Sequence, residues 1–243
     1  MTDLELAFGN LRLRASPEQI LDGTCGHSFT CFYEKNEASE LAALCDIYGS
    51  DKREIALSGH PYPWTSHTYT DFYESLFDHC REHVRRVFEC GIGTNNPKIA
   101  SNMGATGRPG ASLRVWKEYF PNAEIYGADI DRDILVREDR ITTFHVDQTL
   151  PVAIRAMWEE IGVADFDIII DDGLHTFEAG QCLFEHSFSR LRKGGIYVIE
   201  DVAPQAMVRF RAYFTTVRRN VQFVTLRRRE TRFHDNALIV IRN

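Results

Sequence analysis

Two pairs of adjacent acids end two apolar runs of this 243-residue sequence. The run FDIII leads into Asp171 and Asp172, and the run GIYVIE ends in Glu200, which Asp201 follows. Short continuous apolar runs are typical of strands buried on both faces of a parallel sheet, and their carboxyl ends meet at one edge. Carboxylates that lie so close repel one another unless they are protonated or bind a cation. Because oxygen ligands suit Mg²⁺, Mn²⁺ or Ca²⁺ better than zinc, we expect Asp172, Glu200 and Asp201 to hold such a metal.

A histidine stands beside the first pair, because His175 follows Asp172 by three residues. An alcohol is a weak nucleophile until its proton is removed; a metal lowers the pKa of the hydroxyl and a histidine can accept the proton. We therefore expect His175 and Asp172 to be the catalytic residues of a reaction at a substrate hydroxyl. The alternative is that His175 packs or caps at a loop-to-helix junction and that Glu200 and Asp201 cap the next helix.

A turn with two glycines follows the first expected strand. It reads Glu89-Cys-Gly91-Ile-Gly93-Thr-Asn-Asn96, and its glycines let the backbone turn tightly and approach a ligand. Asn96 stands where a dinucleotide-binding turn has its third glycine, which disfavours NAD. Glu89 is placed for a cationic amino group such as that of S-adenosylmethionine (SAM). An ordinary strand-to-helix turn is the alternative.

Polar residues also end the next two expected strands. The second ends in an acid, Asp129, that is placed to accept hydrogen bonds from both hydroxyls of a ribose, and Asp131 is the second candidate. The third is followed by Asp147 and Gln148, which we expect near the adenine amine; alternatively, Asp147 caps the following helix. The segment Asn95–Gly110, rich in Gly, Pro and Asn, indicates an inserted loop between the glycines and Asp129.

Short apolar runs alternate with helical stretches after residue 80, which indicates βαβ units and a parallel sheet. The last two strands have only the polar stretch RRRETRFHDN between them, so the final strand should run antiparallel. We predict an α/β fold: a Rossmann-like, seven-stranded, mostly parallel sheet over residues 81–243, with an N-terminal helical extension over residues 1–80. The predicted strands are Arg86–Cys90, Glu124–Ala128, Ile141–Val146, Phe166–Ile170, Gly195–Glu200, Val221–Leu226 and Ala237–Ile241. The predicted helices are Glu37–Tyr48, Tyr69–His83, Ala111–Tyr119, Pro151–Ile161, Phe177–Leu191 and Ala206–Thr216.

Composition and charge disfavour several classes of protein. Hydrophobic residues make up 44% and charged residues 26% of the chain, as in soluble globular proteins, and no apolar run approaches the roughly 20 residues that span a bilayer. The net charge of −7 argues against nucleic-acid binding, and the basic stretch Arg218–Arg229 is more typical of a solvated face. The six cysteines lack C-x-x-C spacing, which favours a reduced, cytoplasmic protein without a signal peptide. A zinc site at Cys25, His27 and Cys31 would lack a fourth ligand.

Six segments together resemble a known family. They are GSDK (residues 49–52), His67-Thr-Tyr69, ECGIG, GASLRVWKEYFPNAEIYGADID, DIIIDDGLH and GGIYVIEDV. As a set, over about residues 45–203, they resemble the metal-dependent sugar O-methyltransferases of antibiotic pathways, those that methylate macrolide deoxysugars above all. The same core also resembles proteins described as cephalosporin hydroxylase-like, so the resemblance leaves the acceptor open.

The resemblance implies SAM as methyl donor, Mg²⁺ (or Mn²⁺) held by Asp172, Glu200 and Asp201, and His175 as general base. It also implies that GSDK and the segment His67-Thr-Tyr69 close over the cofactor, which adds His67 and Tyr69 to the cofactor-binding candidates; Asp171 is counted with them. The expected partner is a small-molecule hydroxyl acceptor, a sugar or a glycosylated natural product, and a homo-oligomer is left open. The chain departs from the macrolide enzymes in its long insertion Asn95–Gly110, in DDGLH where DDGSH is usual, and in lacking their large N-terminal domain.

Three other classes of protein are weighed against this interpretation. An NAD-dependent oxidoreductase or epimerase would need the third glycine, and the Tyr-x-x-x-Lys pair of such enzymes is absent. A non-catalytic SAM- or nucleotide-binding module would not need two acid pairs and a histidine at one end of the sheet. A nucleic-acid methyltransferase is supported by Arg218–Arg229 and opposed by the net charge.

Overall fold

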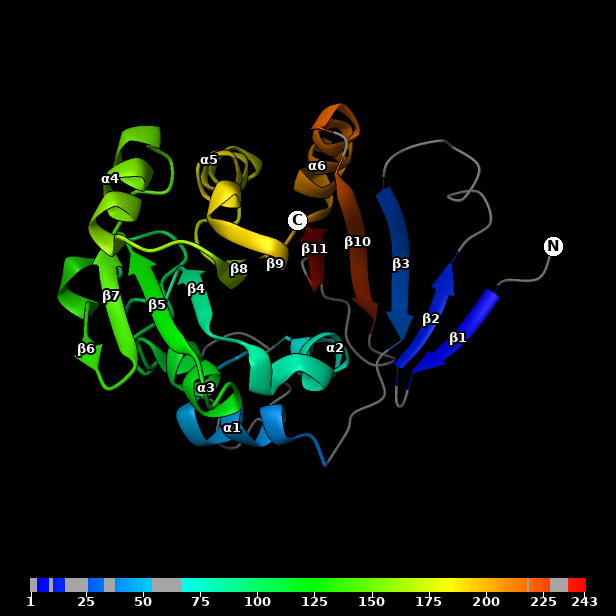
Figure 1. Cartoon of the computed structure of the whole chain (residues 1–243), viewed down its shortest axis with the longest axis horizontal. Helices are drawn as coiled ribbons and strands as arrows, with labels where there is room; N and C mark the ends of the chain where they lie inside the picture. Colours follow the sequence, from blue (N-terminus) through cyan, green and yellow to red (C-terminus); the bar gives the residue numbers. More distant parts are fainter. Residues whose placement is uncertain are drawn as a thin grey trace.

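The computed structural model describes residues 4–8, 11–15, 26–32, 38–53, 67–217, 219–227 and 236–243. One mixed sheet runs through these residues, with helices on both of its faces (Figure 1). The strand order is β1-β2-β3-β10-β11-β9-β8-β4-β5-β7-β6. Strands β4, β5, β7, β8 and β9 are parallel to one another, whereas β6 runs antiparallel to β7 and β11 runs antiparallel between β9 and β10.

The elements have the following bounds. The strands are β1 Leu4–Phe8, β2 Leu11–Ala15, β3 Gly26–Phe32, β4 Arg86–Cys90, β5 Glu124–Asp129, β6 Arg137–Glu138, β7 Ile141–His145, β8 Phe166–Asp171, β9 Leu191–Ile199, β10 Asn220–Arg227 and β11 Ala237–Arg242. The helices are α1 Glu40–Tyr48, α2 Tyr69–Phe77, α3 Ala111–Tyr119, α4 Pro151–Ile161, α5 Phe177–Ser187 and α6 Pro204–Val217. Short 3₁₀ turns cover Asp78–His83, Arg132–Ile134 and Phe188–Arg190.

The predicted fold class is confirmed. The seven predicted strands correspond to β4, β5 and β7 to β11, and the antiparallel last strand is present. The two-residue strand β6, which pairs with β7, is an eighth strand of residues 81–243 that the sequence did not predict. The prediction of a helical N-terminal extension is incomplete, because this extension also contains β1, β2 and β3. Strand β3 pairs in parallel with β10 over seven residues, so its conformation depends on a partner about two hundred residues away rather than on a local pattern. The candidate zinc ligand Cys25 lies outside the described residues, and so do Arg218, Arg228 and Arg229 of the basic stretch.

Two hydrophobic cores lie on the two faces of the sheet. Side chains alternate between the faces along a strand: in β8, Ile168 and Ile170 join the core under α1, α2 and α3, whereas Ile169 joins the core under α4, α5 and α6. Trp116 of α3 and Trp158 of α4, each at most 1% exposed, are the largest buried side chains of the two cores. Helices on both faces bury β8 and, from Val87 onward, β4, which is why these strands are mostly apolar up to the acids at their carboxyl ends.

The loops at the carboxyl ends of the central strands are fixed by backbone hydrogen bonds that continue the sheet. The N–H of Gly91 donates to the carbonyl of Ala128 (2.8 Å), that of Asp172 to Cys90 (2.8 Å) and that of Glu200 to Asp171 (2.9 Å). The residues after β4, β8 and β9 are therefore held nearly as rigidly as the strands themselves. Within the described residues no helix is long and apolar enough to cross a membrane.

Candidate active site

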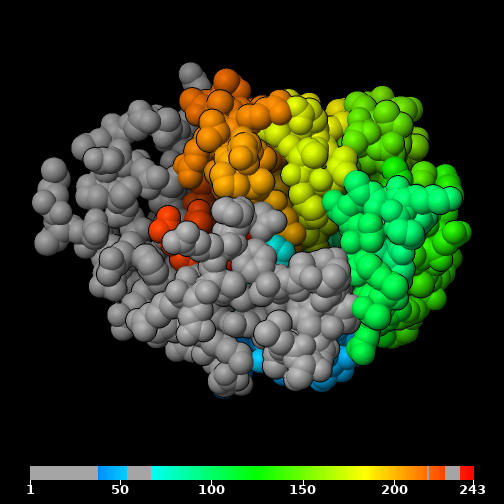
Figure 2. All heavy atoms as spheres, turned by 180° about the vertical axis from the view of Figure 1, so that it is seen from behind, coloured from blue at the N-terminus to red at the C-terminus, as the bar shows by residue number. Residues whose placement is uncertain are grey.

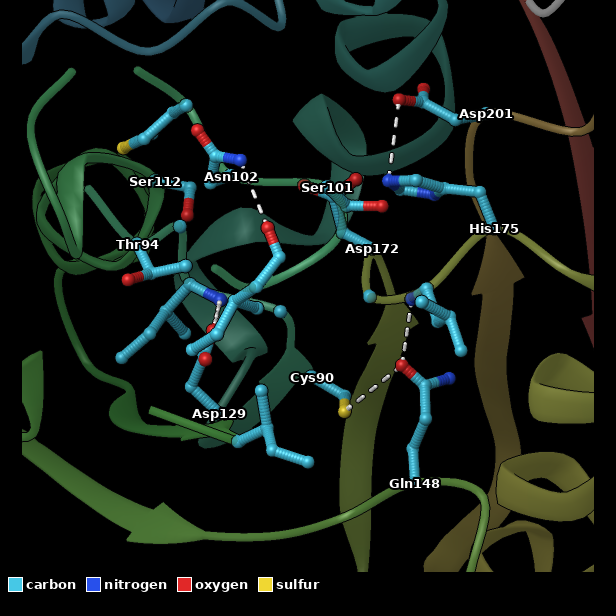
Figure 3. A pocket seen from close by; sticks show the side chains of 18 of the residues that line it. Cys90, Thr94, Ser101, Asn102, Ser112, Asp129, Gln148, Asp172, His175 and Asp201 are labelled. Atoms are coloured by element: carbon cyan, nitrogen blue, oxygen red, sulfur yellow. Dashed lines mark hydrogen bonds and ion pairs between the residues drawn. The ribbon is translucent and has the colours of Figure 1, made fainter. Parts of the chain in front are cut away.

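A cavity of about 540 Å³ opens at the carboxyl ends of β4, β5, β7 and β8, the size of a pocket for a small molecule. Its walls come from the loops that follow these strands, from the insertion at Ile99–Met103, and from Ser50–Lys52 and His67. Figure 3 shows Asp129 and Thr94 at one side of the cavity and Asp172, His175 and Asp201 at the other. The site thus has a side with the glycine turn and a side with the acids and histidine.

The glycine turn is built around a close approach between two strand-end loops. Gly91 has φ 85°, and a Cβ at this position would lie 2.0 Å from the carbonyl oxygen of Asp172. Gly93 has φ 80°, and a Cβ there would meet the side chain of Met103. Both glycines line the cavity. Because they lack side chains, their backbone borders the space for a ligand, and the loop that carries Asp172 can pack against Gly91.

Asp129 lies at the end of β5 and lines the cavity (Figure 3). Its two carboxylate oxygens accept separate hydrogen bonds, Oδ2 from the N–H of Ile92 and Oδ1 from the N–H of Asp131, both at 2.9 Å. Burial raises the pKa of Asp129, although these two hydrogen bonds act to lower it. Asp131 accepts from the Thr94 hydroxyl and from the N–H of Asp133 and is not among the cavity-lining residues. The geometry therefore favours Asp129 over Asp131 as the acid that contacts a bound ligand.

Asp147 and Gln148 also line the cavity. Asp147 accepts from the N–H and the hydroxyl of Thr149, at 2.9 and 2.6 Å, while helix α4 begins after Leu150 without a side-chain cap. Gln148 bridges to the next loop, because its Nε2 donates to Asp171 Oδ1 (3.0 Å) and its Oε1 accepts from the N–H of Leu174 (2.8 Å). Asp147 thus shapes a turn, and Gln148 joins the end of β7 to the DDGLH loop.

Asp171 points away from the main cavity. It is 3% exposed, and its Oδ2 faces a small interior cavity that is also lined by Gly180 and Phe210. Burial raises the pKa of Asp171 to about 6, against the hydrogen bond from Gln148. The structure therefore places this cofactor-binding candidate behind the cavity wall.

The insertion forms a wall of the cavity. Its path is fixed by the N–H of Met103, which donates to the carbonyl of Thr94 (2.8 Å), and by the Asn95 amide, which donates to the carbonyls of Gly104 and Gly107. Ile99–Met103 line the cavity as a result. Residues near position 100, blue-green in Figure 2, are exposed on the face seen there.

Asp172, His175 and Asp201 offer ligand atoms that lie within 4.8 Å of one another. His175 Nε2 is 3.8 Å from Asp201 Oδ2 (Figure 3). His175 and Asp201 both have left-handed backbone conformations, with φ 57° and 54°, which are uncommon for residues other than glycine and are concentrated at functional sites. Two carboxylates and an imidazole at the mouth of a cavity fit a divalent cation such as Mg²⁺ or Mn²⁺.

Two residues of the N-terminal part hold Asp201 in place. The hydroxyl of Tyr69 donates to Asp201 Oδ1 (2.5 Å), and His67 Nε2 lies 3.3 Å from Oδ2. The His67 and Tyr69 rings stack with centroids 4.8 Å apart. His67 lines the cavity and Tyr69 does not. The segment His67-Thr-Tyr69 therefore contacts Asp201 directly and contributes one side chain to the cavity.

Glu200 and Glu89 lie deeper, around the ammonium group of Lys52. Glu200 is 1% exposed, contacts Lys52 Nζ at 2.5 Å and accepts a hydrogen bond from the Tyr73 hydroxyl. Glu89 is fully buried, accepts from Trp116 Nε1 (2.5 Å) and lies 3.3 Å from Lys52 Nζ. Burial raises the pKa of Glu200 well above its usual value and also raises that of Glu89, although Lys52 opposes both shifts.

The structure brings most of the predicted site residues to one cavity. Gly91, Gly93, Asp129, Asp147, Gln148, His67, Asp172, His175 and Asp201 line it. Glu89, Asp131, Tyr69, Asp171 and Glu200 lie behind this lining layer. Sequence reasoning missed Lys52 as a site residue, because a single lysine in a turn carries no pattern, although Lys52 belongs to the GSDK run of the family resemblance.

The sheet order, the glycine turn and the cavity at the strand ends define a Rossmann-like fold with a ligand site at its switch point. No protein-family model matches the sequence. The chain is 36% identical over 185 residues to 8-demethyl-8-alpha-L-rhamnosyl tetracenomycin-C 2'-O-methyltransferase of Streptomyces olivaceus, a match that covers 76% of this chain and 43% of the relative. It is 35% identical over 180 residues to demethylmacrocin O-methyltransferase of Streptomyces fradiae, covering 73% of this chain and 43% of that protein.

A solved structure gives the same result. The MycE methyltransferase from the mycinamycin biosynthetic pathway, in complex with Mg, SAH and mycinamycin VI, superposes with a TM-score of 0.58 at 26% identity, covering 83% of this chain and 54% of that one. The chain spans about 43% of the length of the two curated relatives. It therefore has a methyltransferase fold and resembles the sugar O-methyltransferases of macrolide and tetracenomycin biosynthesis over the part that it shares with them, as its motifs indicated.

Proposed function

We propose that this chain is a SAM-dependent, divalent-metal-dependent O-methyltransferase that acts on a hydroxyl of a sugar or a glycosylated natural product. One observation carries the proposal: a single cavity has the glycine turn and Asp129 at one side and Asp172, His175 and Asp201 at the other. The similarity to sugar O-methyltransferases supports the same conclusion.

The two sides of the cavity suit the two halves of the reaction. Asp129 lies where a carboxylate can accept the hydroxyls of a ribose, beside the close-approaching backbone of Gly91 and Gly93. SAM would supply a methyl group on a positively charged sulfur, and a divalent cation would lower the pKa of the acceptor hydroxyl. Asp172 and Asp201 are the cavity-lining carboxylates that would hold the cation, with Glu200 behind them.

His175 is proposed as the group that receives the proton. Its Nε2 faces the acids, 3.8 Å from Asp201 Oδ2, and its side chain is 27% exposed, so an acceptor in the cavity can reach it. Nε2 would accept the hydroxyl proton as the acceptor oxygen takes the methyl group that SAM would supply, with the thioether of S-adenosylhomocysteine as the leaving group. Asp201, which Tyr69 and His67 hold in place, would stabilise the positively charged imidazolium by electrostatic attraction.

A third-ligand role is the alternative for His175, since its ring lies within the same group of candidate metal-binding atoms as Asp172 and Asp201. The two roles predict different results for His175→Gln. Loss of a base lowers turnover with metal affinity unchanged, whereas loss of a ligand lowers both.

The expected acceptor is a small molecule, because the cavity is of that size and the similar proteins carry names of small-molecule methyltransferases.

The four cysteines for which the structure gives a state, Cys45, Cys80, Cys90 and Cys182, are free thiols, which supports the reduced, cytoplasmic location proposed from the sequence.

Methyl transfer tests the proposal directly. The protein is incubated with isotopically labelled SAM, Mg²⁺ and a panel of glycosylated natural products, each paired with its sugar-free aglycone, and products are identified by mass spectrometry. We expect label on the glycosides and none on the aglycones. Label on aglycones alone would refute the sugar acceptor, and undiminished transfer after verified metal removal would refute the metal requirement.

A further inference from the structure

A buried ammonium group lies among the acids of the proposed metal site. Lys52 is 2% exposed. Its Nζ lies 2.7 Å from Asp172 Oδ2, 2.5 Å from Glu200 Oε2 and 3.3 Å from Glu89 Oε1. Lys52 therefore contacts one acid at the end of each of β4, β8 and β9, and it stands between two of the three predicted metal ligands, where a cation shared by Asp172 and Glu200 would lie.

The backbone around Lys52 is firmly held. The Lys52 carbonyl accepts hydrogen bonds from the N–H groups of Tyr69 (2.9 Å) and Thr70 (3.2 Å) at the start of α2, and the N–H of His67 donates to the Asp51 carbonyl (2.8 Å). The segment is therefore fixed to the element that also positions Asp201. The side chain of a lysine is a point charge on a flexible stem, so the ammonium can move while its backbone stays in place.

The contacts around the ammonium are unequal. Asp172 lines the cavity and its side chain is 20% exposed, so a cation entering from solvent reaches this acid first. Glu89, whose Oε1 lies 3.3 Å from Nζ, is fully buried, does not line the cavity and accepts a hydrogen bond from Trp116. Because an ammonium and a divalent cation repel at contact distance, both cannot sit between Asp172 and Glu200.

We propose that Lys52 is an internal counter-ion that competes with the divalent cation for Asp172 and Glu200 and withdraws toward Glu89 when the cation binds. The inference rests on the metal site of the proposed function. It gives GSDK a role that follows from contacts: its lysine neutralises the buried acids in the metal-free protein and sets the affinity of the site for the metal. It also gives Glu89 a role, as the acid that keeps the displaced ammonium.

The test is a titration of the metal-free protein with Mn²⁺, followed by calorimetry, in the absence of SAM and acceptor. Lys52→Met removes the competitor, so Mn²⁺ should bind more tightly by about tenfold or more, the factor that one charge-assisted hydrogen bond is typically worth. Glu89→Gln removes the negative charge toward which the ammonium withdraws. This variant should therefore bind Mn²⁺ more weakly than the native protein does. Lys117→Met is the matched control: this lysine pairs with Asp139 at 3.3 Å on the surface, and its loss should leave Mn²⁺ affinity nearly unchanged.

Opposite shifts in Lys52→Met and Glu89→Gln support the proposal. Unchanged or weaker Mn²⁺ binding by a folded Lys52→Met variant overturns it, and so does an equal gain in Lys117→Met, which would indicate a general effect of net charge. Should Lys52→Met not fold, Glu89→Gln decides alone, because affinity equal to that of the native protein contradicts a withdrawal toward Glu89. Methyl transfer is assayed separately, so a protein that binds Mn²⁺ as expected but transfers no methyl group refutes the proposed function and leaves the competition standing.

Discussion

Asp129→Asn separates the structural role of this residue from the cofactor-binding role that we propose for it. The carboxylate is 7% exposed, and each of its oxygens accepts one backbone N–H, from Ile92 and from Asp131, at 2.9 Å. An asparagine has one acceptor oxygen, so its amide nitrogen would face one of these donors. A buried donor left without an acceptor costs about 1–3 kcal/mol, and we expect the free energy of unfolding to fall by about that amount.

The same change should weaken binding of the cofactor. Replacing a charged acceptor of the ribose hydroxyls by a neutral one should cost about 1.5–3 kcal/mol of binding, which is about a ten- to hundredfold rise in the Kd of S-adenosylhomocysteine. Calorimetry measures the affinity and denaturant unfolding measures the stability.

Asp131→Asn is the control for Asp129→Asn. Asp131 also accepts two hydrogen bonds, from Thr94 and the N–H of Asp133, but does not line the cavity. Its replacement should lower stability with little change in affinity. Native affinity in Asp129→Asn, or a larger loss of affinity in Asp131→Asn, would refute the assignment of Asp129 to the ribose.

The other predictions concern the chemistry and the core. His175→Ala should lower kcat by about 10²–10⁴-fold, the usual effect of losing a general base, with S-adenosylhomocysteine affinity unchanged; near-native kcat would exclude the base role. EDTA should abolish turnover and Mg²⁺ or Mn²⁺ should restore it, whereas full activity after verified metal removal would leave Asp172 and Asp201 with structural roles. Burial raises the pKa of the Cys45 thiol to about 12, and because only the thiolate reacts, iodoacetamide at pH 8 should label Cys45 in denaturant but not in the folded protein; rapid labelling of the folded protein would contradict the packing of α1.

The sequence was sufficient for strands β4, β5 and β7 to β11, because their signals are local. The run FDIII and all of RVFEC except Arg86 are buried and read as strands without help from the rest of the fold, and α3 and α4 have the predicted bounds. Strand β3 could not be predicted in this way, since its pairing with β10 joins distant parts of the chain. The same reason explains why the extension was described as helical.

The sequence predicts which strand ends carry the site residues, but not which side chains face the cavity and which are buried behind it. Position at a strand end brought Asp129, Asp172 and Asp201 to the cavity. It gave no information on which of two adjacent acids faces the ligand, and the structure turns Asp171 inward beside Gly180. Lys52 shows the limit most clearly, because its contacts with Asp172, Glu200 and Glu89 depend on how the N-terminal segment folds back over the sheet.

The most direct test of the account is whether the cavity binds the product of the methyl donor. Calorimetric titration of the protein with S-adenosylhomocysteine, with NAD as the competing ligand, measures this without knowledge of the acceptor. The account predicts one molecule of S-adenosylhomocysteine bound per chain and no measurable binding of NAD. Binding of NAD in preference to S-adenosylhomocysteine would contradict the central claim that this is a SAM-dependent methyltransferase.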